Sequence, residues 1–105
     1  NEMKSLLSRF SGVKFIFDNV KQKYYPVLRD AITSFRSKNE GKPLVVIDDT
    51  PFIDFDILDY PVNDIEEIFL LKGSDAAIWG PKASNGIIVI ITQRGKSTKI
   101  EQKEE

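Results

Sequence analysis

Six consecutive residues near the end of the chain, Ile87–Thr92, are apolar or β-branched, and the turn sequence Ser84-Asn85-Gly86 stands directly before them. Residues of this kind favour strands, and a run without polar alternation predicts a strand that is buried on both faces. Such a strand must lie at the centre of a sheet that other elements cover on both sides. The chain has 105 residues, which corresponds to one domain, so we expect one small sheet built around Ile87–Thr92.

Shorter patterns along the chain predict the neighbours of this strand. Alternation and short apolar runs predict four further strands, at Val13–Phe17, Val27–Phe35, Leu44–Ile47 and Ile68–Leu71. Helices are expected at Lys4–Phe10, at a brief turn capped by Asn63 or Asp64, and at Ala76–Trp79, capped by Ser74 or Asp75. A loop, a turn and an irregular segment with at most one helical turn are expected at Asn19–Tyr25, Arg36–Lys42 and Pro51–Pro61. The result is an α+β domain with two or three short helices.

The composition excludes most catalytic chemistry. The sequence contains no His and no Cys, and its formal net charge is −1. It therefore offers no imidazole as a general base or metal ligand, and no thiolate nucleophile. A net charge this small also provides no basic field for nucleic acid. We expect no enzyme activity, no cofactor, no bound metal and no nucleic-acid partner.

A glycine-rich stretch before the last strand raises the question of a phosphate-binding loop. A P-loop has four residues between its first Gly and the sequence Gly-Lys-Ser/Thr. Here six residues separate Gly73 from Gly80, and Pro81, which has no backbone N–H for a phosphate, precedes Lys82. We therefore interpret the glycines as structural: Gly80 ends a short helix, and Asn85-Gly86 forms the reversal into the strand.

The second candidate site is the acidic group Asp48, Asp49, Asp54, Asp56 and Asp59. Its spacing partly imitates a calcium loop, but the Gly at the sharp turn and the Glu at the twelfth position are missing. A carboxylate-dependent hydrolase stays an alternative, with Asp48 and Asp49 as its candidates. We favour the interpretation that these Asp residues occupy turns and form a solvated edge of the domain.

The aromatic residues are expected mainly in the core, because no basic groove accompanies them for base stacking. The adjacent pair Tyr24-Tyr25, beside Lys21 and Lys23, is the cluster that we expect to be most exposed. We predict a contact surface at Tyr24 and Tyr25.

From Lys42 onward the sequence carries a more specific pattern. The stretch PLVVIDDTPF (43–52) is followed by VNDIEEIFLLKGSDAAIWGPKASNGIIVIITQRG (62–95). This order of features resembles the plug domain of TonB-dependent outer-membrane receptors, especially those that import glycans and other nutrients. The structural signature of that resemblance comprises Pro43, Asp48, Asn63, Asp64, Gly80, Asn85, Gly86 and Gly95.

The N-terminal half is similar to the same family over shorter stretches. SLLSRFSGVKF (5–15) resembles a family stretch with the pattern A-L-Q-G-R-V-P-G-V-x-V, and VLRDAITSF (27–35) occupies the place of a family strand. Two positions depart from the pattern: Asp30-Ala31 stands where an Arg-Gly step is usual, and Asp49 stands where Gly is usual.

The resemblance implies a plug-domain-like fold, a small mixed β-sheet with short helices that is seated inside a β-barrel. Residues 1–95 would form the plug-like domain, and the charged residues 96–105 a disordered C-terminal tail. The function that it implies is that of a gate: the domain blocks the pore of a receptor that imports nutrients with energy from TonB. No catalytic group is needed for that role.

The partners implied by the resemblance are the β-barrel of the same or an associated receptor, and TonB through a segment outside this chain. A glycan or other nutrient is the implied ligand. The implied location is the Gram-negative cell envelope, in the outer membrane inside a barrel or in the periplasm.

The end of the sequence leaves a second interpretation open. A first barrel strand would alternate apolar and polar residues, whereas KSTKIEQKEE (96–105) is almost entirely polar. The chain could therefore be a plug-like binding or assembly module without a barrel, at the C-terminus of a larger periplasmic or surface-exposed protein.

Overall fold

The computed structural model of the chain describes residues 1–28 and 41–94. It contains two α-helices, three single-turn 3-10 helices and six strands among these residues. In chain order they are α1 (Glu2–Leu7), β1 (Val13–Asp18), β2 (Lys23–Leu28), β3 (Leu44–Ile47), β4 (Thr50–Phe52), η2 (Ile57–Asp59), η3 (Val62–Asp64), β5 (Ile65–Leu71), α2 (Ser74–Ala77), η4 (Pro81–Ala83) and β6 (Ile87–Thr92). The predicted α+β class is confirmed. None of the helices in the described ranges is long and apolar enough to span a bilayer.

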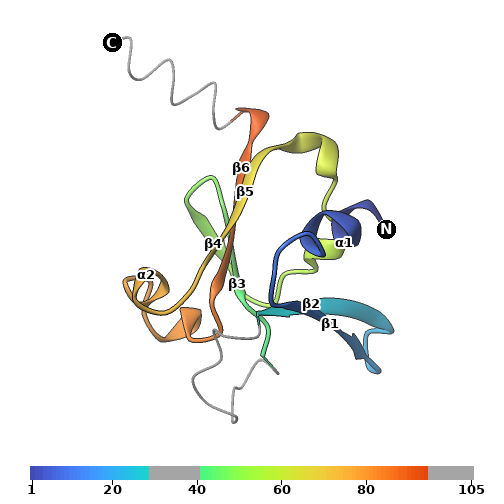
Figure 1. The fold of residues 1–105 in the computed structure, drawn as a ribbon, viewed down its shortest axis with the longest axis horizontal. Helices are drawn as coiled ribbons and strands as arrows, with labels where there is room; N and C mark the ends of the chain where they lie inside the picture. The colour runs from blue at the N-terminus through green and yellow to red at the C-terminus, as the bar shows by residue number, and fades with distance from the viewer. Residues whose placement is uncertain (29–40, 95–105) are drawn as a thin grey trace.

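The strands form two sheets (Figure 1). One has four strands in the order β4-β3-β6-β5, in which β3 and β6 run parallel and the other pairs antiparallel. The other is the antiparallel hairpin β1-β2. The sheet is therefore mixed, and β6 lies between β3 and β5, as predicted for Ile87–Thr92.

The two faces of the four-stranded sheet carry separate cores. In β3 and β6, alternate residues point to opposite faces. One set joins α1 and the hairpin in the α1-side core: Met3, Leu7, Leu28, Val45, Ile57, Ile88 and Ile90. The other set joins α2 and η4 in the α2-side core: Leu44, Val46, Ala76, Ala83 and Ile87. Figure 1 shows α1 and α2 on opposite sides of the sheet.

Helix α1 covers one face of the sheet. It has a capped N-terminus and two apolar residues spaced so that both point toward the core. The Asn1 side chain caps it by accepting a hydrogen bond of 2.9 Å from the Lys4 N–H. Met3 and Leu7, four positions apart, are both fully buried, which stabilises the fold by about 1.5–3 kcal/mol for each side chain. The helix was predicted at Lys4–Phe10; it begins earlier, because Asn1 caps it, and it ends at Leu7.

The hairpin corrects a second prediction. Asn19–Tyr25 was expected to be a loop, but β2 begins at Lys23, and the turn is completed by Gln22, which has a φ of 57°. The strand predicted at Val27–Phe35 coincides with β2 only over Val27–Leu28. Positions 29–40 lie outside the described residues, and with them most of the turn expected at Arg36–Lys42.

Two further corrections concern the segment after β3. Pro51–Pro61 contains the expected single helical turn, η2, but it begins in strand β4 rather than in irregular structure. Pro61 and Gly73 occupy the N-cap positions of η3 and α2, without a side-chain cap bond. The capping roles predicted for Asn63 or Asp64 and for Ser74 or Asp75 were therefore wrong.

Hydrogen bonds from side chains hold both ends of the parallel pair β3–β6. At one end, the Asn85 Nδ2 donates to the Lys42 carbonyl at 3.2 Å, beside the bond of 3.0 Å from the Leu44 N–H to the Gly86 carbonyl. At the other end, the Asp48 carboxylate accepts bonds from the Thr92 N–H, at 3.0 Å, and from the Thr92 hydroxyl. We call these contacts the end bonds of β3–β6.

The Asp48 end bond depends on an unusual turn. Asp48 and Asp49 connect β3 to β4 with φ values of 48° and 71°, as a two-residue hairpin of the I′ type requires. This confirms the predicted turn role of both residues. Because neither is Gly, the turn carries backbone strain, although Asp tolerates this region better than most residues.

We predict that Asp48→Ala destabilises the chain more than Asp49→Ala does. Both variants replace an Asp at positive φ, so the strain that Ala adds is similar in each. Only Asp48→Ala removes the carboxylate that binds Thr92, and a hydrogen bond to a charged group contributes about 1.5–3 kcal/mol. Urea denaturation should show a difference of about that size between the variants; equal losses would contradict the role assigned to the Asp48 end bond.

Candidate functional site

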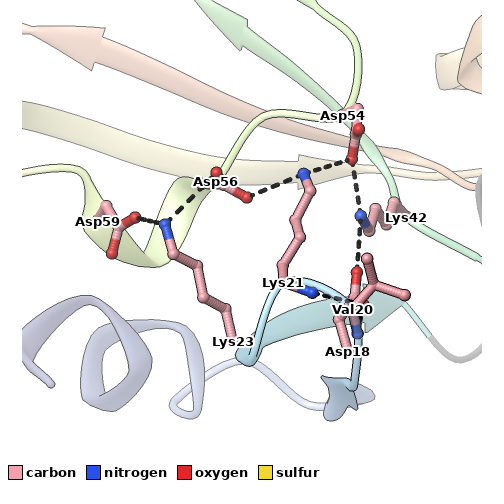
Figure 2. A network of polar contacts seen from close by, with 8 residues as sticks. All are labelled: Asp18, Val20, Lys21, Lys23, Lys42, Asp54, Asp56 and Asp59. Atoms are coloured by element: carbon pink, nitrogen blue, oxygen red, sulfur yellow. Dashed lines mark hydrogen bonds and ion pairs between the residues drawn. The ribbon is translucent and has the colours of Figure 1, made fainter.

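Seven charged side chains line the joint between the hairpin and the main sheet (Figure 2). They alternate in sign along a chain of contacts that we call the ion-pair network: Asp18, Lys42, Asp54, Lys21, Asp56, Lys23 and Asp59. The shortest contacts are those of Lys23 with Asp59, at 2.6 Å, and of Lys42 with Asp54, at 2.7 Å. Lys21 lies 3.3 Å from Asp54 and 3.4 Å from Asp56.

The turn of the hairpin places its share of these charges. Asp18 ends β1, and its carboxylate accepts bonds from the N–H groups of Val20, at 2.9 Å, and Lys21, at 3.2 Å. The bond from Lys21 is the main cause that lowers the pKa of Asp18, and the Val20 N–H and the Lys42 ammonium lower it further. The turn thus holds Asp18 ionised and directs Lys21 toward the main sheet.

Lys42 stands at the centre of the joint. Its ammonium lies 2.7 Å from Asp54, 3.6 Å from Asp18 and 4.9 Å from the centroid of the Tyr25 ring. Its side chain is 14% exposed, the least of the three lysines, and its bond to Asp54 is the first cause that lowers the pKa of that carboxyl. Lys42 therefore joins the hairpin, the start of β3 and the segment after β4 through one side chain.

The network orients these elements more than it stabilises them. The side chains of Asp54, Asp56 and Asp59 are 44–58% exposed, and exposed ion pairs contribute about 0–1 kcal/mol each. The Asp residues that were predicted to form a solvated edge thus also contact lysines, which their spacing in the sequence did not predict. In residues 1–28 and 41–94, no group of three or more acidic side chains is placed to hold a metal ion.

The predicted aromatic surface is divided between two faces of β2. Tyr24 is 48% exposed, packs edge-on against Phe17 at 5.1 Å, and has the Lys4 ammonium 4.1 Å from its ring centroid. Tyr25 is half-buried against Lys42. A contact surface at these tyrosines stays a prediction, to which Tyr24 offers the more exposed ring.

The signature residues lie mostly at the ends of strands. Pro43 is buried just before β3, Asn85 and Gly86 hold the start of β6, and Asp48 holds its end. Gly80 precedes η4 with a φ of 85°, a value that favours Gly. Gly95 lies outside the described residues. Four signature positions therefore surround the pair β3–β6.

Asn63 and Asp64 lie in η3. Asn63 is exposed, whereas Asp64 accepts a bond of 2.7 Å from the Tyr60 hydroxyl. Burial and then this bond raise the pKa of Tyr60 to about 12. The contact fixes the path of the chain into β5.

Comparison with known proteins identifies one family. The model of the family described as TonB-dependent Receptor Plug Domain matches residues 1–87. This range contains the α2-side core, all of the α1-side core except Ile88 and Ile90, the end bonds at Asn85 and Gly86, and the whole ion-pair network. Searches of curated proteins and of solved structures gave no match.

We predict that Lys42→Met lowers the free energy of unfolding by removing contacts at the joint, whereas Lys82→Met, on η4, does not. Lys42→Met leaves Asp18 and Asp54 without the shared ammonium, and we expect a loss of about 1–2 kcal/mol in the free energy of unfolding. Since the folded pKa of Asp54 lies below its ordinary value of 3.8, its contribution is present above that value and is lost as the pH falls through the lowered pKa.

Chemical denaturation between pH 6 and pH 2 tests this expectation. The free energy of unfolding should fall more steeply for the wild type than for Lys42→Met below about pH 4, because the variant lacks the main cause of the Asp54 shift. Parallel curves would show that the Lys42–Asp54 contact does not contribute to folding.

Proposed function

Because this chain belongs to the TonB-dependent receptor plug domain family, we propose that it is the gate of such a receptor. In this role it occludes a β-barrel pore and takes part in nutrient import that is triggered by ligand and energised by TonB. Plug domains of these receptors are transport components rather than enzymes. The observation that carries the proposal is the family match over residues 1–87.

The distribution of polarity supports seating in a barrel. Plugged barrels of about 22 strands are known among outer-membrane transporters, and barrel interiors are polar. The described residues bury two apolar cores on the faces of the sheet and leave the carboxylates of Asp54, Asp56 and Asp59 largely exposed at the surface. A plug with such a surface can be wetted by the lumen and needs no lipid-facing belt.

Gating needs one part of the plug to move while another keeps its fold. The four-stranded sheet, with the end bonds of β3–β6, is suited to the part that stays folded. The hairpin β1-β2 shares no strand pairing with it and meets it through the α1-side core and ion pairs. We propose that a rearrangement begins at this joint, where screened contacts cost little to exchange.

The proposed partners follow from the family. They are the barrel of the same or an associated receptor, TonB, and a glycan or other nutrient as ligand, in the outer membrane or periplasm of a Gram-negative cell. A carboxylate-dependent hydrolase at Asp48 and Asp49 receives no support from the contacts, since both residues form the β3–β4 turn and Asp48 is bound to Thr92.

Conductance across a planar lipid bilayer tests the gate. The full-length gene product should form a closed or weakly conducting channel, and deletion of residues 1–95 from it should raise the conductance severalfold, because the lumen is no longer filled. A channel that conducts equally with and without these residues would contradict gating. A full-length product that forms no channel in either version would favour the module without a barrel.

We also expect the isolated chain to bind sugars weakly or not at all. A plug supplies only part of a ligand site, and the remaining walls belong to the barrel. Isothermal titration with a panel of mono- and oligosaccharides should give dissociation constants no tighter than about 1 mM. Micromolar binding by this chain alone would contradict the shared-site arrangement.

A further inference from the structure

The dipeptide Asn85-Gly86, directly before the central strand β6, can undergo a reaction of its own. It is the single Asn-Gly step of the sequence, and Asn is a thermolabile residue type. The backbone nitrogen of the following residue can attack the carboxamide carbon of Asn, which closes a succinimide ring. The carboxamide nitrogen then leaves as ammonia and takes the proton of the attacking nitrogen. Gly favours ring closure because it has no Cβ to obstruct it.

The folded structure protects both groups that must react. Asn85 is 5% exposed, and its Nδ2 donates to the Lys42 carbonyl at 3.2 Å. The nucleophile would be the Gly86 nitrogen, but its N–H donates to the Ala83 carbonyl at 3.0 Å. Next to it, the Gly86 carbonyl accepts a bond of 3.0 Å from the Leu44 N–H. Because two of these bonds cross from β6 to the start of β3, ring closure requires this end of the β3–β6 pair to separate.

The product of the reaction cannot restore the end bond at Asn85. Water opens the ring at either of its carbonyl carbons and leaves an aspartate or an isoaspartate at position 85. Neither carboxylate has an N–H to donate, so two acceptors would face each other in a buried place at the Lys42 carbonyl. Isoaspartate also adds a methylene to the backbone just before Ile87, which is fully buried and paired with Leu44, and this disturbs the register of β6.

We propose that Asn85-Gly86 is a modification site that reacts only when the β3–β6 pair opens and then leaves a permanent product. The reaction needs water and no enzyme, and hydrolysis of the ring does not return the amide. A chain that stays closed keeps Asn85, whereas a chain that has reacted closes less well. The site goes beyond the proposed gate and does not rest on it, because it can be measured on this chain without a barrel.

Peptide mass spectrometry of the full 105-residue chain tests the requirement for opening. The chain is incubated in mildly alkaline buffer made with isotopically heavy oxygen, at urea concentrations from zero to beyond the unfolding transition. Each molecule that reacts exchanges its amide for a carboxylate with one solvent oxygen. A synthetic peptide of residues 82–88, KASNGII, in the same solutions corrects for any effect of urea on the chemistry itself.

The corrected rate at position 85 should be at least tenfold lower in the folded chain than in the unfolded chain, because only the open form reacts. Below the unfolding transition, the logarithm of the rate should rise with urea, since opening exposes surface. A folded chain that reacts as fast as the peptide, or at a rate that urea does not change, would show that Asn85 reacts without opening.

A pair of variants tests whether the whole β3–β6 pair must open. Asp48→Ala removes the end bond to Thr92 at the far end of the pair and leaves the contacts of Asn85 in place. Its matched control is Asp49→Ala, in the same turn. Asp48→Ala should react about tenfold faster than Asp49→Ala, in step with its lower free energy of unfolding. Equal reaction rates in two variants that differ in unfolding free energy would contradict opening of the pair.

The consequence of the modification is tested by making its aspartyl product directly. Asn85→Asp should lower the folded-to-unfolded ratio at least tenfold in urea denaturation, because the donor to the Lys42 carbonyl is lost. Asn63→Asp makes the same change of charge at an exposed position of η3 and should alter the ratio about twofold at most. Equal stability of the two variants would overturn the claim that the product closes less well.

These measurements are separate from those on the gate. The rate experiments use the wild type and the two turn variants, so they remain decisive even if Asn85→Asp does not fold. A failure of the proposed modification leaves the conductance test unaffected, because occlusion of a pore requires no reaction at Asn85.

Discussion

The parallel pairing of β3 with β6 is the constraint on which the rest of this structure depends. Each of the two strands contributes alternate side chains to both cores, so the α1 side and the α2 side are packed on the same two segments. A parallel pair cannot be closed by a tight turn, and here the paired segments are more than 40 residues apart, as the Lys42–Asn85 bond illustrates. The end bonds hold the register of this long-range pair, and a slip of one residue would turn every side chain of β6 to the wrong core.

The hairpin β1-β2 is attached to this central pair by contacts of a different kind. The hairpin β1-β2 is joined to the sheet by one apolar core and by alternating charges that are mostly exposed. Packed apolar groups lose much free energy when they separate, whereas exposed ion pairs can exchange partners with water or with a neighbouring surface at little cost. For the proposed gate, this contrast separates a part that keeps its fold from a joint that can rearrange.

Predictions from the sequence succeeded where a local pattern was sufficient. The apolar run Ile87–Thr92 indicated a central strand, and Asn85-Gly86 indicated the reversal before it, because both are properties of a few consecutive residues. The start of β2 was missed because Lys23 and Tyr24 read as polar, although their strand is stabilised by pairing with β1. The caps of η3 and α2 were assigned to residues with suitable side chains, yet Pro61 and Gly73 occupy these positions. Tertiary packing decided these boundaries against local preference.

The sequence by itself determined the fold class, the central strand, the turn at Asp48-Asp49 and the family resemblance, which the family model confirms over residues 1–87. These properties depend on the order and period of residues, which a sequence displays directly. The tertiary structure alone decided that Asp48 binds Thr92, that Lys42 joins Asp18 to Asp54, and that β5 lies at the end of the strand order. The physical reason is distance along the chain: partners separated by 12 to 44 residues meet only through strand register and packing, and residue type alone does not select one lysine or one carboxylate among many.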